Sequence, residues 1–138
     1  MKVNFKLIKN GKLPITKTTG AACLDAYSRV HEIINPYERK LIPLGFAVEL
    51  PEDYEMVIRP RSGFTKNCID GAIGTIDSDY RGEVFACLIN NSDFVFTVNE
   101  NDRIAQLAIR RAPKIEPVVV TELSDTLRGT GGFGSTGV

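Results

Sequence analysis

The 138-residue sequence contains no tryptophan, a single histidine and only three cysteines. Cys23, Cys68 and Cys87 are far apart and form no CxxC pair, which argues against a zinc site or a disulfide framework. We expect all three to be small, buried apolar residues in a reducing compartment. His31 lies in a polar stretch with no nucleophile motif beside it, so a mechanism that depends on a histidine and a nucleophilic serine or cysteine is not expected.

The chain also lacks a net charge, because 17 basic residues balance 17 acidic residues. A surface that grips long nucleic acid is therefore not expected, although a local basic pocket is compatible with this balance. No apolar run reaches the roughly 18 residues needed to span a bilayer. The first residues show neither the hydrophobic region nor the cleavage site of a signal peptide. We expect a cytoplasmic protein without a nucleic-acid or membrane partner.

Apolar residues recur with a period of two rather than 3.6, which is typical of half-buried strands. Val3, Phe5 and Leu7 alternate with polar residues, and the sequence shows no long amphipathic helix. A short helical turn is expected only at 64–67. Turn-forming residues separate the apolar runs, so the pattern predicts an all-β sandwich or barrel. Further strands are expected at 40–42, 46–50, 56–58, 84–89, 94–98, 104–109 and 115–120.

The composition changes at the C-terminal end, where five of the residues from 129 to 137 are glycine. We therefore divide the chain into a β-barrel domain at 1–123 and a flexible C-terminal arm at 124–138. A glycine-rich segment buries little, so a frayed end is one interpretation of the arm. The other is a lid, because Arg128, Phe133 and hydroxyl groups among the glycines suit an anionic, aromatic ligand.

Two polar segments contain candidate site residues. Arg61-Ser62-Gly63 follows a strand and offers an arginine, a hydroxyl and backbone amides to an oxyanion, although an ordinary surface turn would look the same. The stretch 74–84 lies between two apolar runs, which predicts a hairpin. This hairpin is either a solvated acidic turn or a holder for a flat ring, with Asp77 and Tyr80 placed to act on a ligand and a water.

Polar residues also occur within predicted strands. Asp25 lies in an apolar strand, where a buried carboxylate needs a partner. Arg103 and Gln106 begin another strand, and their odd spacing predicts that they point to opposite faces.

Together these segments resemble the five ordered motifs of the homotrimeric dUTPase family, the deoxyuridine triphosphate nucleotidohydrolases. The resemblance covers nearly the whole chain, and its third and fifth motifs are the most specific. The motifs are TGAACLDAY at 19–27, PRSG at 60–63, GTIDSDYRGE at 74–83, NDRIAQL at 101–107 and RGTGGFGSTG at 128–137.

The resemblance implies a jelly-roll-like β subunit and a homotrimer with active sites at its subunit interfaces. It also implies Mg²⁺ held through the triphosphate, with no direct protein ligand. The implied reaction converts dUTP to dUMP and pyrophosphate, which limits uracil incorporation into DNA and supplies dUMP for dTMP synthesis. Asp77 would orient and activate the attacking water. Tyr80 would pack under the deoxyribose and leave no room for a 2′-hydroxyl.

The other residues implied by the resemblance bind the substrate or support those that do. Backbone groups at Thr75 and Ile76 would read the uracil edge, and Gly71 stands where many members have an asparagine-containing loop. Asp25 and Arg103 would support the site from behind. The groups that would hold phosphates are Arg61, Ser62, Gly63, Gln106 and, from the arm, Arg128. The remaining arm residues are Phe133, which would stack on uracil, and the neighbouring Gly134 and Ser135.

Two alternatives differ in the function they imply. The related dCTP deaminases share the fold but have a catalytic glutamate at the place that Cys87 occupies here, and a thiol cannot replace that carboxylate as a proton shuttle. A regulatory or binding protein on the dUTPase scaffold is the second alternative. Intact Asp77, Tyr80 and arm argue against loss of activity, but they are compatible with an added protein partner.

Overall fold

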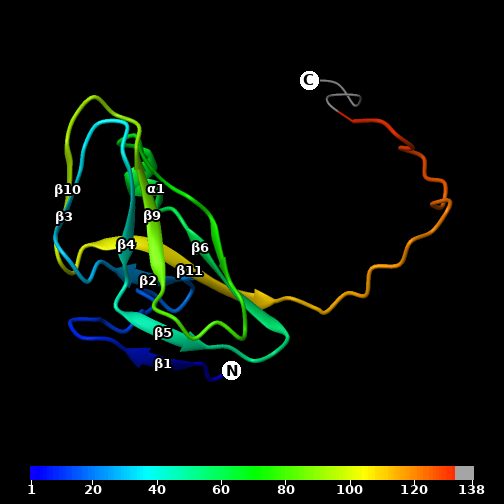
Figure 1. Ribbon diagram of the computed structural model, residues 1–138, viewed down its shortest axis with the longest axis horizontal. Coiled ribbons are helices and arrows are strands. Elements are labelled where there is room, and N and C mark those ends of the chain that lie inside the picture. The colour runs from blue at the N-terminus through cyan, green and yellow to red at the C-terminus, as the bar shows by residue number, and fades with distance from the viewer. Residues whose placement is uncertain (133–138) are drawn as a thin grey trace.

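The computed structural model describes residues 1–132 and confirms an almost entirely β architecture (Figure 1). No helix within this part of the chain is long and apolar enough to span a membrane. The elements are β1 (Asn4–Leu7), β2 (Leu24–Tyr27), β3 (Glu32–Ile34), β4 (Arg39–Pro43), β5 (Phe46–Glu49), β6 (Tyr54–Arg59), α1 (Ser62–Thr65), β7 (Ile69–Gly71), β8 (Gly74–Ile76), β9 (Phe85–Asn90), β10 (Phe96–Val98) and β11 (Arg103–Arg111).

The strands form two larger antiparallel sheets and two short pairs. The four-stranded sheet has the order β2-β11-β6-β8, and the three-stranded sheet has the order β4-β9-β7. The pairs are β1-β5 and β10-β3. One core contains apolar side chains from both larger sheets, including Met56 and Leu107 from the first and Ile42 and Leu88 from the second. The sheets therefore pack face to face, as in a jelly roll.

The four-stranded sheet presents a second, outward face, and the strand register decides which residues lie on it. On β6, Met56 and Ile58 belong to the core, so Val57 and Arg59 lie on the opposite face. Gln106 is the partner of Arg59 on β11, and directly opposite residues share a face. This outward face therefore contains several of the polar residues that the sequence singled out.

The buried side-chain amide of Asn90, at the end of β9, joins the end of β3 to the loop before β10. Asn90 is fully buried, and its Nδ2 donates to the carbonyls of Ile34, Asn35 and Phe94 at 3.1, 3.1 and 2.7 Å. Its Oδ1 accepts from the backbone and the hydroxyl of Ser92. The side chain thus satisfies its own polar groups and those of the loops around it.

The strands expected at 40–42, 46–50, 56–58, 84–89, 94–98 and 104–109 are present with small shifts, and α1 confirms the short helical turn. The strand expected at 115–120 is wrong. Paired structure ends with β11, and Ala112 N–H, which donates to the Asp53 carbonyl, is the last backbone link to the barrel before this stretch. Residues 112–132 then run away from the body of the molecule (Figure 1). The segment has strand-like composition, but no strand of the described chain pairs with it.

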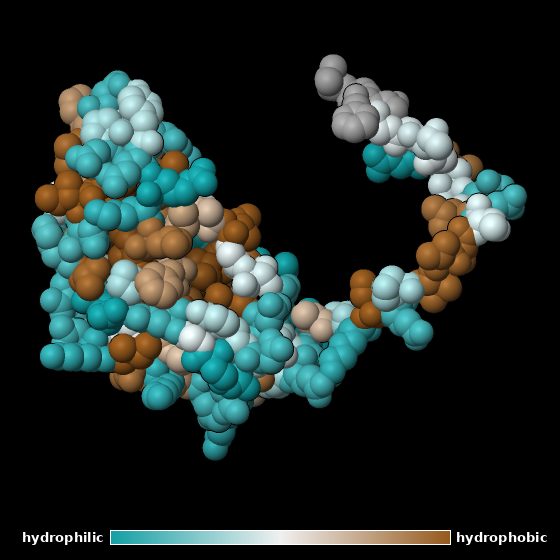
Figure 2. Space-filling view, viewed as in Figure 1, coloured by the Kyte–Doolittle hydropathy of each residue, from teal (hydrophilic) through white to brown (hydrophobic). Residues whose placement is uncertain are grey.

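Residues 112–132, which we call the outer segment, also expose apolar side chains, which is unusual for an unpaired stretch. Val119 is 99% exposed and Leu123 is 87% exposed. Figure 2 shows hydrophobic stretches along this part of the chain, well separated from the barrel. Exposed apolar groups of this kind are typical of surfaces that contact another molecule.

The cysteines are less buried than expected. All three are free thiols; Cys23 and Cys87 are half-buried and Cys68 is exposed. The expectation of burial is wrong for Cys68 because this residue follows α1 in a left-handed conformation, with φ at 59°. It forms part of the surface turn that leads from α1 into β7.

Candidate active site

Arg103 and Gln106 lie on the same face of β11, contrary to the expectation from their spacing. Arg103 is opposite Tyr27 and Gln106 is opposite Asp25, and the register shifts between Arg103 and Ala105. A bulge places an extra residue in one strand and so reverses the alternation beyond it. Because Tyr27 and Asp25 share a face of β2, the bulge brings both polar side chains of β11 to the outward face.

Asp25 has the partners that a buried carboxylate requires. The residue is 6% exposed, and its Oδ2 accepts a hydrogen bond from Arg103 Nη1 at 3.1 Å. Arg61 Nε lies 4.0 Å from Oδ1, and Arg61 Nη1 donates to the Arg103 carbonyl at 2.7 Å. The three side chains form what we call the arginine group. It fixes the start of α1, where Ser62 and Gly63 are exposed.

A shallow hollow of about 350 Å³ adjoins the arginine group, between α1 and the start of β11. Arg61 and Arg103 supply positive charge and Asp102 one carboxylate, and Phe64 and Phe96 supply aromatic walls. The Arg61 guanidinium lies 5.7 Å from the centre of the Phe64 ring, within the range of a cation–π contact. Two arginines beside exposed hydroxyl and backbone groups suit the binding of an anion.

The stretch 74–84 is not a hairpin, so that prediction is wrong. β8 pairs with β6 in the four-stranded sheet, whereas β9 pairs with β4 and β7 in the other sheet. The two apolar runs are close in sequence, but they enter different layers of the sandwich. Residues 77–84 therefore form a loop that crosses from one sheet to the other, and we call it the crossing loop.

Glu83 anchors the crossing loop. Its carboxylate accepts two hydrogen bonds from Arg29, at 2.8 and 3.1 Å, and a third from the Gly45 amide at 3.1 Å. Two parallel bonds between guanidinium and carboxylate fix direction as well as distance. Sequence reasoning missed Arg29, because the two partners are 54 positions apart and nothing local links them.

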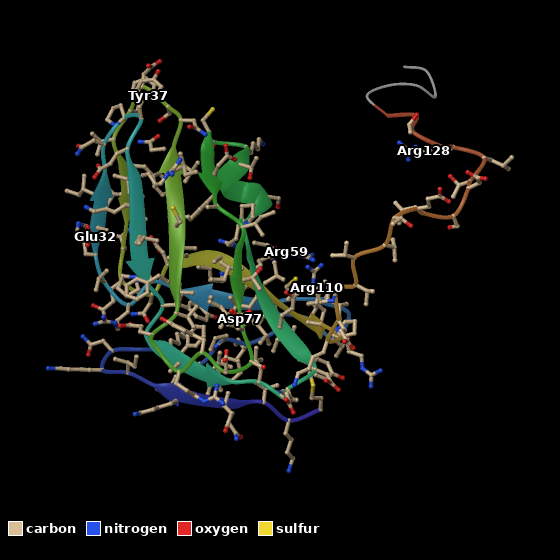
Figure 3. All side chains as sticks on the ribbon, turned by 45° about the vertical axis from the view of Figure 1, so that its right-hand side comes forward. Glu32, Tyr37, Arg59, Asp77, Arg110 and Arg128 are labelled. Carbon is tan, nitrogen blue, oxygen red and sulfur yellow. The ribbon has the colours of Figure 1, made fainter. Side chains whose placement is uncertain are left out.

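Asp77 and Tyr80 lie on this loop. Asp77 is exposed just beyond the end of β8 (Figure 3), and its carbonyl accepts from the Tyr80 amide at 3.2 Å. Tyr80 Oη donates to the Glu83 carbonyl at 2.9 Å, which holds the ring across the loop. A Cβ on Gly82 would lie 2.3 Å from Tyr80 Oη, so only glycine at this position leaves the ring where it is.

Gly71 lies with the arginine group rather than with Asp77. A Cβ on Gly71 would meet the Pro60 Cβ at 3.2 Å, so the missing side chain lets β7 pack closely against the residue before Arg61. Thr75 and Ile76 lie further along, on β8, opposite Val57 and Met56. The segment from 71 to 76 thus runs from Pro60 back along the second half of β6.

The predicted site residues fall into separate places within one chain. Ile76 is opposite Met56, and Arg61 follows Met56 by five residues, a separation of roughly 16 Å at about 3.3 Å per residue. Arg128 lies on the outer segment, away from both groups (Figure 3), where its Nε donates to the Gly131 carbonyl at 2.8 Å. Phe133, Gly134 and Ser135 lie outside the described residues.

The fold defines a class of protein, the all-β, jelly-roll-like chains. Three further features accompany the fold here: an arginine group suited to anions, an exposed aspartate on an anchored loop, and a long C-terminal segment. The chain belongs to the dUTPase family, because the family model for dUTPase matches residues 9–137. The resemblance carried by the five motifs is thereby confirmed.

Curated relatives agree with this assignment over most of their length. The deoxyuridine 5′-triphosphate nucleotidohydrolase of Nautilia profundicola is 48% identical, over 96% of this chain and 95% of the relative. The enzyme of the same name from Rhizobium rhizogenes is 46% identical, over 91% and 85%.

Solved structures share the fold. The dUTPase of Staphylococcus bacteriophage 80alpha, bound to dUpNHpp, superposes with a TM-score of 0.95 at 26% identity, covering 99% of both chains. A mutant dUTPase from phage phi11 of S. aureus, described for its coordination of a structural Mg(II) ion, superposes with a TM-score of 0.86 at 22% identity, covering 91% of this chain and all of that chain.

Proposed function

We propose that this chain hydrolyses dUTP to dUMP and pyrophosphate, and so limits uracil incorporation into DNA while supplying dUMP for dTMP synthesis. The observation that carries the proposal is the combination, in a dUTPase-family chain, of an exposed Asp77 on an anchored loop with a separate arginine group. Hydrolysis of a phosphoanhydride needs a positioned water and neutralised phosphate oxygens, and little covalent help from the protein.

Asp77 is the proposed general base. A carboxylate at the end of β8 orients a water and accepts its proton as the water attacks phosphorus, which contributes about 10²–10⁴-fold to the rate. Tyr80 supports the sugar face of the site: its ring is held by the bond to Glu83 and by the space that Gly82 leaves. A ring fixed in this way packs under a deoxyribose and excludes a 2′-hydroxyl.

The remaining proposed contacts divide between phosphates and base. The arginine group favours phosphate binding near α1, where Arg61 is already oriented by Asp25 and Arg103. Backbone groups of Thr75 and Ile76 are proposed to read the uracil edge. Gly71 is proposed to contact the substrate through its backbone alone. The proposed phosphate ligands are Arg61, Ser62, Gly63, Gln106 and Arg128. The proposed arm contacts to the base are Phe133, by stacking, and Gly134 and Ser135 beside it.

We propose that Mg²⁺ binds through the triphosphate rather than through protein side chains. Within residues 1–132, no three or more His, Cys, Asp or Glu side chains come together as a metal site. The polar groups near α1 are mainly arginines, which suit phosphate oxygens and leave these oxygens to coordinate the ion. Mg²⁺ commonly keeps several waters and binds substrate phosphates in this way. When bound, the ion would neutralise charge on the phosphates.

A homotrimer with active sites between its subunits accounts for the separation of these groups. The roughly 16 Å estimated between Ile76, the residue before Asp77, and Arg61 in one chain is too long for Asp77 and Arg61 to act on the same water. The exposed apolar segment after β11 supports contact with a neighbouring subunit. Light scattering at micromolar concentration should give three times the monomer mass, and a monomer mass would contradict this assembly.

The substrate is tested by measuring pyrophosphate release from dUTP, dCTP, dTTP and UTP side by side. We expect release from dUTP to exceed the other three clearly. Ammonia from dCTP would instead indicate a deaminase, although Cys87 on β9 offers no carboxylate for that reaction. Absence of any nucleotide turnover would leave the regulatory protein as the better proposal, to be followed by capture of partners.

We also propose a cytoplasmic location, where the three free thiols would stay reduced.

A further inference from the structure

Arg59 is the last residue of β6 and directly precedes the Pro60–Gly63 segment. Its partner across the sheet is Gln106 of β11. Directly opposite residues of antiparallel strands have Cβ atoms about 4.5–5.5 Å apart and point to the same side. The proline that follows also restricts Arg59 to an extended backbone. Arg59 is therefore fixed beside Gln106 on the outward face of the four-stranded sheet.

The carboxylates on this part of the sheet already have partners. Asp25 pairs with Arg103 and lies near Arg61. Glu55, four residues before Arg59 on the same face of β6, pairs with Arg110 at 2.6 Å. Arg59 is exposed and makes no ion pair or side-chain hydrogen bond with residues 1–132. Its guanidinium is thus available to an external anion.

The positive charges nearby outnumber the negative ones, which favours an anionic ligand. Arg59, Arg61 and Arg103 contribute three positive charges, and Asp25 and Asp102, which borders the hollow, contribute two negative charges. Figure 3 shows Arg59 near the α1 end of β6, away from Asp77. A guanidinium presents paired donors that match two phosphate oxygens at once. None of the five motifs includes this residue.

We propose that Arg59 is a further substrate-binding residue, which contacts the β- or γ-phosphate of dUTP beside Gln106. The inference rests on the proposed function, since it assumes that the triphosphate lies along the arginine group. It assigns Arg59 to recognition of the phosphate chain and not to the base, the sugar or the attacking water.

The test compares binding of dUpNHpp and of dUMP, measured by calorimetry with Mg²⁺ present. We expect Arg59→Ala to weaken dUpNHpp binding about 10-fold or more and to leave dUMP binding unchanged, because dUMP lacks the two outer phosphates. Arg59→Lys should retain part of the affinity, since lysine keeps the charge but not the paired donors. Arg39→Ala is the matched control, because Arg39 is an exposed arginine on β4, in the other large sheet.

The outcomes separate this proposal from the one on which it rests. A wild-type protein that fails to bind dUpNHpp would overturn the proposed function. Wild-type binding with an unchanged affinity in Arg59→Ala, or with equal losses for dUpNHpp and dUMP, would overturn only the role of Arg59. A change of mass in light scattering for Arg59→Ala and Arg59→Lys alike would assign the residue to subunit contact and would also overturn the proposal.

Discussion

Asp25 and Asp77 are both aspartates of the five motifs, and their surroundings give them different chemistry. Asp25 is 6% exposed and held by two arginines, so its negative charge is used in orienting Arg61 and Arg103. Asp77 is exposed at the end of a strand, where a water can approach it. The sequence predicted that a carboxylate in an apolar strand needs a partner, which the arginines beside Asp25 supply. The role of Asp77 as general base stays a prediction from the family resemblance.

Asp77→Asn should keep the fold and the binding of dUpNHpp but lose at least about 10²-fold in kcat, because an amide cannot accept the proton of the attacking water. Steady-state kinetics and calorimetry on the same preparation measure the two effects. Asp79→Asn is the matched control, since Asp79 is an exposed aspartate of the same loop. Near-normal turnover in Asp77→Asn with a large loss in Asp79→Asn would assign the base to Asp79.

Tyr80→Ala should raise the kcat/KM of UTP relative to that of dUTP, because removing the ring opens space for a 2′-hydroxyl. Tyr80→Phe is the control: it loses only the hydrogen bond to the Glu83 carbonyl and should keep most of the preference for deoxyribose. Competition between the two nucleotides measures the ratio directly. If both activities fall together and the ratio is unchanged, Tyr80 is a packing residue and does not select the sugar.

At the scale of elements, the crossing loop depends on one half-buried ion pair. Glu83 receives bonds from Arg29 and from the Gly45 amide, and these link the loop to the strands β4 and β5 on either side of Gly45. Arg81 adds exposed contacts, in which its Nη1 donates to the Ser78 and Tyr80 carbonyls at 2.7 and 3.1 Å. The placement of Asp77 and Tyr80 is therefore a property of the loop and its anchor.

Glu83→Gln should reduce the free energy of unfolding by about 2 kcal/mol, because it leaves the Arg29 guanidinium half-buried without a charged partner. Turnover should fall as well, since the crossing loop loses its anchor. Glu49→Gln is the control: its pair with Arg81 spans 3.8 Å and both side chains are more than half exposed, so we expect a change within about 0.5 kcal/mol. Urea unfolding compares the two variants, and equal effects would contradict the anchoring role of Glu83.

Most strands could be predicted from periodicity, whereas their pairing could not. The bulge between Arg103 and Ala105 reverses the face of Gln106, and spacing alone cannot reveal an extra residue in a strand. β8 and β9 are close in sequence but enter different sheets, so a pattern typical of a hairpin was misleading. Arg59 lies outside every motif, and only its register with Gln106 connects it to the site.

At the scale of the whole molecule, the segment after β11 is the main departure from a self-contained barrel. Ala112 is bonded to the turn before β6, and Lys114 pairs with Glu52 there, which lowers the pKa of the Glu52 carboxyl and raises the pKa of the lysine. Beyond this attachment the chain extends with apolar side chains exposed. Periodicity predicted a strand at 115–120 because the composition suits one, but composition does not supply a partner strand.

Truncation after Leu127 should leave the unfolding temperature of the ligand-free protein almost unchanged, because the removed residues are glycine-rich and leave no cavity. Turnover should fall steeply, since Arg128 and Phe133 are lost together; stacking on a base alone contributes about 1–3 kcal/mol. Phe133→Ala should therefore cost less than the truncation. Full activity in the truncated protein would return the arm to the interpretation of a frayed end.

Mixing truncated chains with Asp77→Asn chains tests whether an arm acts on another subunit. Mixed trimers would then contain sites with an intact Asp77 from one chain and an intact arm from another. We expect partial recovery of activity after the subunits are allowed to exchange. No recovery, with exchange verified by mass, would show that each arm closes over the Asp77 of its own chain.

The exposed course of residues 112–132 also makes the protein selectively sensitive to proteolysis. Lys114 and Arg128 are trypsin sites on an unpaired stretch, whereas most of the barrel backbone is protected in sheets. A short digestion should therefore release the C-terminal end and leave a folded barrel that ends at Lys114 or at Arg128. Protection of the Arg128 site by dUpNHpp would report closure of the arm on a gel, with no need for a turnover assay.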